Sequence, residues 1–231
     1  MTPDLLAEVM EATWPPAGRS QLGPFTLRDG AGGGKRVSAA TCDGAFTEAD
    51  LAALESAIAD PLALIREGDA ALDAALDARS WRIVDPVVAY AAPVADLTAE
   101  LPFLTAFPHW PPLEVARSLW AEGGIGPARI AVMDRVTGPK AAILGRTGDR
   151  PAGVAFVACN GAEAMVHALE VRDSQRRQGL GRHLLHAAAN WAATQGATRL
   201  SLVVTRQNAA ARALYARLGM QEVGQYHYRQ K

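Results

Sequence analysis

The sequence predicts an α/β (α+β) fold, because segments with the period of a strand alternate with segments with the period of a helix. Residues 165–171 alternate in character and predict a strand, and residues 180–191 place apolar side chains on one helical face. A second strand and a second helix follow over residues 199–205 and 208–219. These two ordered strand–helix units are the strongest fold signal in the chain.

The segment from Met165 to Gly181 is the one around which we expect the fold to be organised. The alternation predicts that one face of this strand carries Met165, His167, Leu169 and Val171. The other face would present Val166, Ala168 and Glu170. The helix that follows begins near Gly179, and Gly196 is well placed to end it.

The turn between this strand and its helix has the chemistry of an anion site. The first backbone N–H groups of a helix have no internal partner, and the helix dipole adds partial positive charge there. Glycine at 179 and 181 leaves that backbone open to a ligand. Only Asp173 opposes the four nearby arginines, which are Arg172, Arg176, Arg177 and Arg182.

Three phosphate-binding motifs could place an anion at such a turn, and two of them are absent. A P-loop needs a Gly-Lys-Ser/Thr ending that the chain lacks, and a dinucleotide fingerprint needs a third glycine where Leu184 stands. The string Arg176-x-x-Gly179-x-Gly181 resembles the acyl-CoA pyrophosphate loop of the GNAT N-acyltransferase superfamily. An ordinary strand-to-helix turn with a solvated basic face is the alternative interpretation.

A second string strengthens this resemblance. Asn208 stands at the expected N-cap of the second helix. The string Asn208-x-x-Ala211-x-x-Leu214-Tyr215-x-x-Leu218-Gly219-Met220 is similar to the second GNAT signature, at the proper distance from the first. The resemblance covers roughly residues 113–231. It implies the GNAT fold, a mixed and mostly antiparallel central sheet with a splayed strand and flanking helices.

The resemblance also implies a reaction and a cosubstrate. GNAT enzymes transfer an acyl group, most often acetyl, from CoA to a primary amine, so acetyl-CoA is the expected cosubstrate and a small molecule or a protein amine the acceptor. The implied cofactor contacts are Leu169, Val171, Arg176, Arg177, Gln178, Gly179, Leu180, Gly181, Arg182 and Asn208. For Asn208, N-capping alone is an equally good explanation. The acceptor pocket is expected around residues 103–127, which are rich in aromatic side chains.

Two side chains are candidates for acid–base catalysis. Tyr215 aligns with the family's usual general acid, since a phenol with a pKa near ~10 can protonate a thiolate; a core aromatic is the alternative. Glu170, beside the expected thioester, is the candidate general base, unless water deprotonates the amine. His167 is expected to be a core or cleft-wall histidine and otherwise an alternative base. The rival function is a non-catalytic acyl-CoA sensor or interaction module with the same fold.

The N-terminal part of the chain predicts a similar order of elements. We expect strands at 25–28 and 35–40 joined by a glycine-rich hairpin loop at 29–34, a helix after the capping box Thr47-x-x-Asp50, a strand at 61–65, a helix at 69–78, and a strand at 83–92. Pro86 predicts that the last strand is bent or lies at an edge. This order resembles a degenerate GNAT-like half, as in tandem-GNAT proteins.

A cluster of prolines divides the chain. Six of its 14 prolines lie within residues 86–112. We therefore predict a degenerate GNAT-like N-terminal domain at 1–95, a Pro-rich connection at 96–112 and a catalytic GNAT domain at 113–231. In the last we expect a helix from 113, strands at 140–146 and 153–159, and an ambiguous segment at 129–136. Few residues follow Gly219, so the usual pair of closing strands must be short or shared.

Composition excludes several classes of partner. A net charge of -1 over 231 residues argues against a nucleic-acid binder. No apolar run approaches the ~20 residues of a membrane span, and the N-terminus lacks the basic start of a signal peptide. Two cysteines, with His183 and His186 on one helix, form no metal or disulfide framework. We expect no metal and a cytoplasmic location; the oligomeric state stays open.

Overall fold

The structure is a computed structural model that describes all 231 residues. The helices are α1 (Pro3–Thr13), α2 (Glu48–Ala57), α3 (Ala70–Ala78), α4 (Val94–Leu97), α5 (Glu114–Glu122), α6 (Pro127–Arg135), α7 (Leu180–Thr194) and α8 (Ala209–Arg217), with 3-10 helices at Lys35–Val37 and Asp173–Gln175. The strands are β1 (Gly18–Leu22), β2 (Phe25–Asp29), β3 (Thr41–Cys42), β4 (Leu62–Arg66), β5 (Arg82–Pro93), β6 (Ala106–His109), β7 (Lys140–Thr147), β8 (Arg150–Asn160), β9 (Glu163–Val171), β10 (Arg199–Thr205) and β11 (Gln221–Gln230).

One large sheet organises the molecule. Its eight strands follow the order β4-β11-β5-β10-β9-β8-β7-β6, while β1, β2 and β3 form a small second sheet. Within the large sheet β9 and β10 run parallel, and the other neighbours are antiparallel. Residues of α7 and α8 pack on one face and those of α5 and α6 on the other. The predicted mixed, mostly antiparallel sheet with flanking helices is confirmed. No helix is long and apolar enough to cross a membrane.

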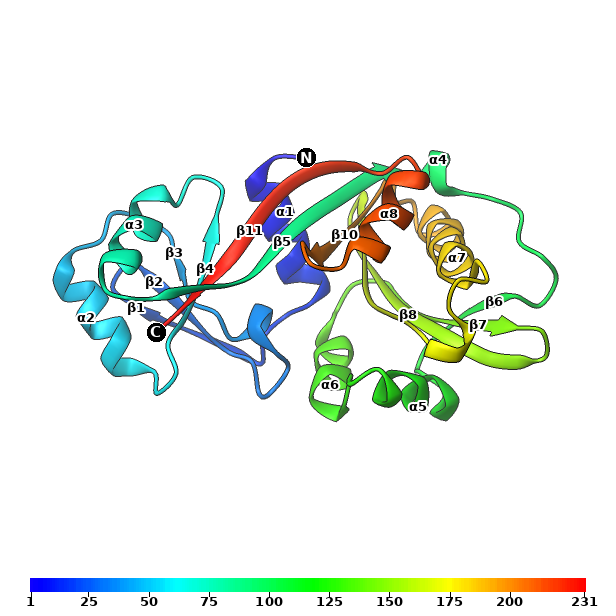
Figure 1. Cartoon of the computed structure of the whole chain (residues 1–231), viewed down its shortest axis with the longest axis horizontal. Coiled ribbons are helices and arrows are strands. Elements are labelled where there is room, and N and C mark those ends of the chain that lie inside the picture. Colours follow the sequence, from blue (N-terminus) through cyan, green and yellow to red (C-terminus); the bar gives the residue numbers. More distant parts are fainter.

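Two long strands belong to both halves of the molecule. β5 comes from the N-terminal part of the chain and lies between β10 and β11, and β11 pairs on its other side with β4. Figure 1 shows β5 and β11 side by side along the length of the molecule. The chain therefore has one closing strand after α8 and takes the partner of that strand from residues 82–93. We expected the closing pair of strands to be short or shared, and it is shared: β11 pairs with β5 from the N-terminal part of the chain.

Pro86 bends β5 without placing it at an edge. The preceding residue, Asp85, has a φ of 44°, and the register against β11 shifts between Tyr226 and Tyr228. The bulge lies where Pro86 cannot donate a ladder hydrogen bond, so the strand can still run through the interior of the sheet.

The hairpin predicted around residues 29–34 is wrong. The hairpin is formed by β1 and β2 around Gly23, and residues 35–37 form a 3-10 helix instead of a strand. The glycine-rich loop packs against α6, because a Cβ at Gly33 would lie 2.5 Å from a methyl group of Val132, and one at Gly32 would lie 3.3 Å from Ala128. Its glycines therefore permit a close approach between the two halves of the molecule.

The proline-rich connection contains a strand that we did not predict. Residues 106–109 form β6, which pairs with β7 at the end of the sheet. An edge position tolerates Pro108, because its missing N–H costs no ladder bond on the solvent side. The ambiguous segment at 129–136 is helical and belongs to α6, which begins at Pro127.

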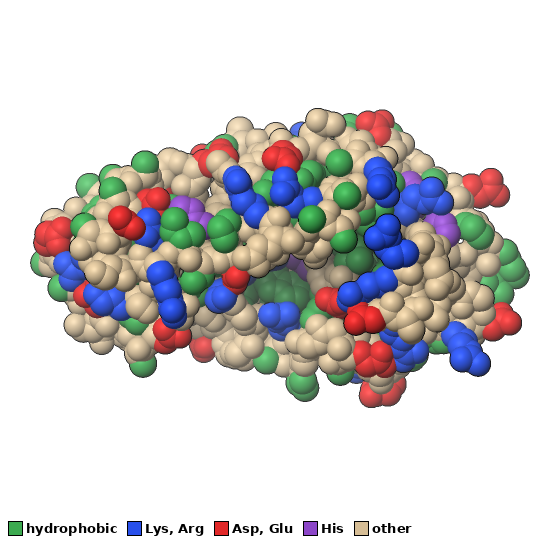
Figure 2. All heavy atoms as spheres, viewed as in Figure 1, with side chains coloured by type: hydrophobic (Ala, Val, Ile, Leu, Met, Phe, Trp, Pro, Cys, Tyr) green, Lys and Arg blue, Asp and Glu red, His purple; other side chains and the backbone are tan.

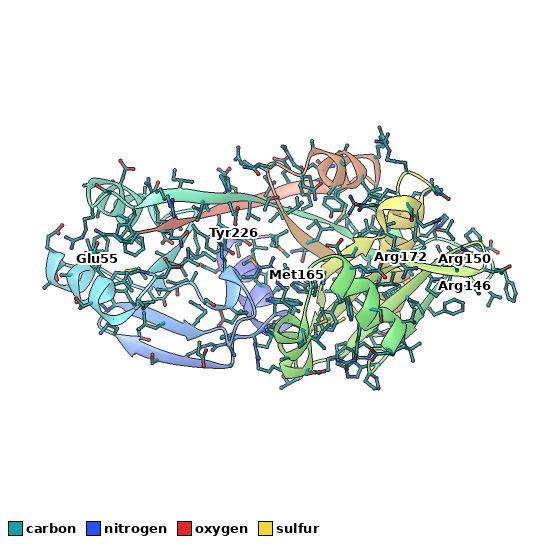
Figure 3. The ribbon with its side chains drawn as sticks, turned by 60° about the horizontal axis from the view of Figure 1, so that its bottom comes forward. Glu55, Arg146, Arg150, Met165, Arg172 and Tyr226 are labelled. Atoms are coloured by element: carbon teal, nitrogen blue, oxygen red, sulfur yellow. The ribbon has the colours of Figure 1, made fainter.

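Glu55 at the far end of the N-terminal half connects three segments (Figure 3). Its carboxylate accepts hydrogen bonds from Arg79 at 3.0 and 3.1 Å, from the Trp81 indole at 2.8 Å and from Lys231 at 2.9 Å. These bonds, led by the one from Arg79, lower the pKa of Glu55 to about 2. The carboxylate thus joins α2 to the start of β5 and to the C-terminus.

We expect Glu55→Gln to lower the free energy of unfolding by roughly 1–3 kcal/mol at neutral pH. The reason is that the carboxyl has a pKa of about 2 in the folded protein and near ~4.3 in the unfolded chain, so folding favours its charged form. This stabilisation is complete above the unfolded pKa and is lost as the pH falls through about 2. Urea unfolding from pH 7 to pH 2 should therefore show the two proteins converging in acid. Glu48→Gln is the matched control, since that side chain is 81% exposed. A difference that stays constant with pH would contradict the assignment.

Candidate active site

The site begins where β9 and β10 separate. They pair over four residues, from Arg199 opposite Glu163 to Leu202 opposite Val166. Beyond that point β10 stays paired with β5 up to Thr205, and β9 stays paired with β8. The edge of residues 167–171 that faces β10 therefore has no strand partner. This is the splayed strand expected from the family resemblance.

A β-bulge in β9 lies at the start of the splay. His167 is opposite Phe156, but Glu170 is opposite Val154, so β9 has one residue more than β8 over this stretch. Ala168 has a φ of 50°, and the Trp120 indole donates a 2.7 Å hydrogen bond to its carbonyl. The bonded carbonyl helps to fix the bulge beside α5.

The bulge corrects the predicted faces of the strand. Leu169 and Val171 pack with the α7 side of the core, whereas His167 stacks among aromatic rings on the other side. Glu170 lies over the end of α5, where a Cβ added to Gly123 would come within 2.8 Å of it. One extra residue inverts the alternation, so the prediction that His167 shares a face with Leu169 is wrong.

The turn after β9 exposes a run of backbone donors. The N–H groups of residues 177–181 have no acceptor within the protein, and α7 begins inside this run at Leu180. Arg177 and Gly179 both have a positive φ, of 65° and 86°. A glycine suits the second position because other residues are strained there. The run has the geometry of an anion site at a helix start.

The four arginines of this turn differ in what they contact. Arg172 pairs with Glu122 at 2.6 and 2.7 Å and so joins the turn to α5. Arg176 pairs with Asp173 at 2.7 Å and donates to the carbonyl of Val171 at 3.0 Å.

Two of these arginines stay available to a ligand. Arg177 and Arg182 make no ion pair and no side-chain hydrogen bond in the structure. Their charge adds to the partial charge of the free amides.

Tyr215 and Glu170 lie close enough to influence each other. Tyr215 is 7% exposed, and burial, with the negative charge of Glu170 second, raises its pKa to about 12. Burial also raises the pKa of Glu170, against the opposing charge of Arg176. The phenol therefore stays protonated, and the carboxyl becomes a stronger base than an exposed glutamate.

Asn208 caps α8 as predicted. Its side-chain oxygen accepts a 3.0 Å hydrogen bond from the N–H of Ala211. The capped helix begins directly after β10 and places Tyr215 against the core, beside the ring of Tyr90 at 5.5 Å. The capping role is thus present whether or not the Asn208 amide also meets a ligand.

A cavity of about 390 Å³ opens where the two halves of the molecule meet at the splay. Its walls are Trp14, Gly33, Gly34, Lys35, Arg36, Asp85, Val87, Ile125, Arg129, His167, Ala168, Val203, Val204, Thr205, Tyr226 and Tyr228. Figure 2 shows the hollow at the middle of this face, with hydrophobic atoms inside and charged side chains at its rim.

The expected aromatic segment contributes little to this cavity. Of residues 103–127 only Ile125 lines it, and Phe103 is 90% exposed. Sequence analysis missed the contribution of the N-terminal half, because no local pattern marks residues 33–36 as part of a site formed with β9 and β10.

A hydrogen-bond chain lies in the wall of the cavity. Arg36 Nη1 donates to His167 Nδ1 at 2.9 Å, and His167 Nε2 contacts the Thr13 hydroxyl, also at 2.9 Å. Since that hydroxyl donates to the Val9 carbonyl, Nε2 must supply the proton to Thr13. Burial, assisted by the Arg36 charge, holds the pKa of His167 well below its usual value. His167 is a cleft-wall histidine, and both of its nitrogens are engaged.

The structure has no group of three or more His, Cys, Asp or Glu side chains that could hold a metal ion. Cys42 and Cys159 are buried and free.

Comparison with known proteins agrees with this geometry. Residues 107–220 match the sequence profile of the Acetyltransferase (GNAT) family. An uncharacterized N-acetyltransferase, YobR of Bacillus subtilis (strain 168), is 34% identical over 61 residues, which is 26% of this chain and 25% of that protein.

The fold as a whole is shared with solved structures. A GCN5-related N-acetyltransferase from Kribbella flavida superimposes with a TM-score of 0.72 at 20% identity, over 99% of this chain and 95% of the other. A tandem GNAT protein from the clavulanic acid biosynthesis pathway gives 0.61 at 16% identity, over 98% and 87%. Residues 107–220 are therefore a domain of the Acetyltransferase (GNAT) family, and the whole chain has the fold of these GNAT structures.

Proposed function

We propose that the protein is an N-acetyltransferase that transfers the acetyl group of acetyl-CoA to a primary amine bound in the cavity between the two halves. The observation that supports this best is the run of five free backbone amides at residues 177–181, next to the splay. Such a run suits a pyrophosphate, and the splayed edge beside it suits the pantetheine arm and the thioester. We further propose a cytoplasmic location, with no nucleic-acid, membrane or metal partner.

The proposed cofactor contacts lie along the amide run at 177–181 and the splayed edge of β9 beside it. Amides of residues 177–181 would take the pyrophosphate with help from Arg177, Arg182, Arg176 and Gln178. The open edge of β9 at Leu169–Val171 would pair with the pantetheine amides. Asn208, whose oxygen caps α8, still has its amide N–H₂ for the same arm.

The chemistry needs a neutral amine, an electrophilic carbonyl and a proton for the departing thiolate. The amine nitrogen bonds to the acetyl carbon, the carbon–sulfur bond breaks, and the amine loses one proton. We assign that proton to Glu170, directly or through water, because its raised pKa makes it a better base. We assign the proton for the thiolate to Tyr215, because its buried phenol is protonated before the reaction; the phenolate then recovers a proton from water or from protonated Glu170.

The N-terminal half is proposed to bind no CoA. At the junction of β4 and α3 the carboxylate of Asp69 accepts hydrogen bonds from the N–H of Arg66 at 2.9 Å and from its guanidinium at 3.0 Å. This carboxylate lies beside the start of α3, where its charge would repel a phosphate. The proposed division is a degenerate GNAT-like domain at 1–95, a connection at 96–112 and a catalytic domain at 113–231.

The proposal is tested first on acetyl-CoA binding. Gly179→Glu places an anion on the amide run and strains a residue with positive φ, so we expect acetyl-CoA affinity to fall at least tenfold. Isothermal titration calorimetry should also give one CoA per wild-type chain. Gly161→Glu, which has a φ of 57° and lies before β9, at the end of that strand opposite the turn, is the matched control. Unchanged affinity, or two CoA per chain, would contradict the assignment.

Catalysis by Tyr215 predicts a loss of turnover without a loss of binding. Tyr215→Phe keeps the ring in the core and removes the proton donor, so kcat should fall roughly ten- to a thousandfold while acetyl-CoA affinity changes little. The measurement is CoA release with a panel of primary amines. Tyr90→Phe, which removes the neighbouring hydroxyl, serves as control. Wild-type turnover in Tyr215→Phe would make this residue a core aromatic, and binding without any turnover in the wild type would favour the non-catalytic module.

A base at position 170 predicts a specific pH profile. Because burial raises the pKa of Glu170, kcat/KM should decline with acid through a pKa above the usual ~4.3 of glutamate. Glu170→Gln should lower the maximal kcat/KM and should remove the decline that is due to Glu170. The remaining pH dependence would then come from the ionisation of the amine substrate. Glu114→Gln at the exposed start of α5 is the control. An identical profile in Glu170→Gln would assign the deprotonation to water.

A further inference from the structure

Arg36 is a partly buried cation that forms no ion pair with any carboxylate of the protein. It comes from the 3-10 helix at Lys35–Val37 and lies in the wall of the cavity. Its neighbours are His167, Tyr226 and Tyr228, and it takes part in no ion pair. Its Nε is buried without any hydrogen-bond partner. A charged group in this state is costly unless something pairs with it.

The neighbours hold Arg36 in place without balancing its charge. His167 directs its lone pair at Nδ1 toward the guanidinium because its proton on Nε2 is used by Thr13. Thr13 is itself fixed by donating to Val9 in α1. The chain of bonds therefore sets the orientation of Arg36 and leaves a full positive charge at the cavity wall.

The other charged groups of the cavity do not supply the missing anion. Asp85 is the one acidic side chain in the lining, and it already pairs with Lys35 at 2.5 Å. Arg129, also in the lining, makes no ion pair. The cavity thus has two unpaired arginines and no unpaired acid.

We propose that the cavity selects an acceptor amine that also bears a carboxylate, and that Arg36 binds this carboxylate. This inference rests on the proposed acetyltransferase function. The guanidinium has a planar fork of donors that matches a carboxylate, and one side of it is already fixed by His167. The amine end of the same molecule would extend toward Ala168 and the end of β10, where the splay opens.

The test compares acceptors that differ only in charge. Primary amines such as 4-aminobutyrate and 5-aminovalerate are supplied as the free acid and as the primary amide, and kcat/KM is measured by CoA release. We expect the wild type to prefer the acids and Arg36→Gln to reduce the acid-to-amide ratio about ten- to a hundredfold, as for a lost charged hydrogen bond. Arg36→Lys should restore part of the ratio, and Arg150→Gln, at an exposed remote hairpin, should keep it.

A binding measurement separates this inference from the proposed function. Glutarate and glutaramide are titrated while the fluorescence of the protein, which includes Trp14 in the cavity wall, is followed. Glutarate should bind more tightly than glutaramide to the wild type and equally weakly to folded Arg36→Gln. If acids and amides are acetylated equally, the inference fails and the acetyltransferase stands. If no amine is acetylated, the proposed function fails, and equal binding of the two probes would overturn this inference as well.

Discussion

The insertion of β5 between β10 and β11 is the constraint on which the rest of the structure depends. The whole of β10, from Arg199 to Thr205, pairs with β5. β9 leaves β10 after Leu202, so the last residues of β10 keep a partner on one side alone. Buried backbone groups need partners. The pairing with β5 therefore holds the end of β10 in the sheet, and the backbone groups on its open side are left for water or a ligand.

This arrangement makes the cavity a product of both halves. β5 and β11 continue past the end of β10 into the N-terminal half, where β11 pairs with β4. The N-terminal half is thereby held over the open side of the splay. The loop at Gly33 and Gly34 packs against α6 and forms the part of the cavity wall on that face of the sheet. The N-terminal half, which we propose binds no CoA, contributes Arg36 and part of the cavity wall.

The range of each interaction along the chain decides what could be predicted from the sequence. The glycine turn, the Asn208 cap and the capping box at Thr47 depend on neighbouring residues, and the first two also match family signatures. The bulge at Ala168 involves a bond from Trp120, and the environment of Arg36 depends on His167, 131 positions away. No local pattern reports such contacts, so the faces of β9 beyond Ala168, the loop at 29–34 and the cavity wall could not be predicted.

The two proposed binding regions use charge in different ways. Arg177 and Arg182 are exposed at the turn, where water and salt screen them, so they can attract an anion without discriminating strongly between anions. Arg36 is only partly exposed in the cavity wall and is held by His167, so its charge is screened less than theirs. A ligand without a matching anion would leave that charge unpaired in the cavity, which costs more than the contact gains. Under the proposed function, the exposed arginines would therefore favour capture of the cosubstrate, and Arg36 would select the acceptor.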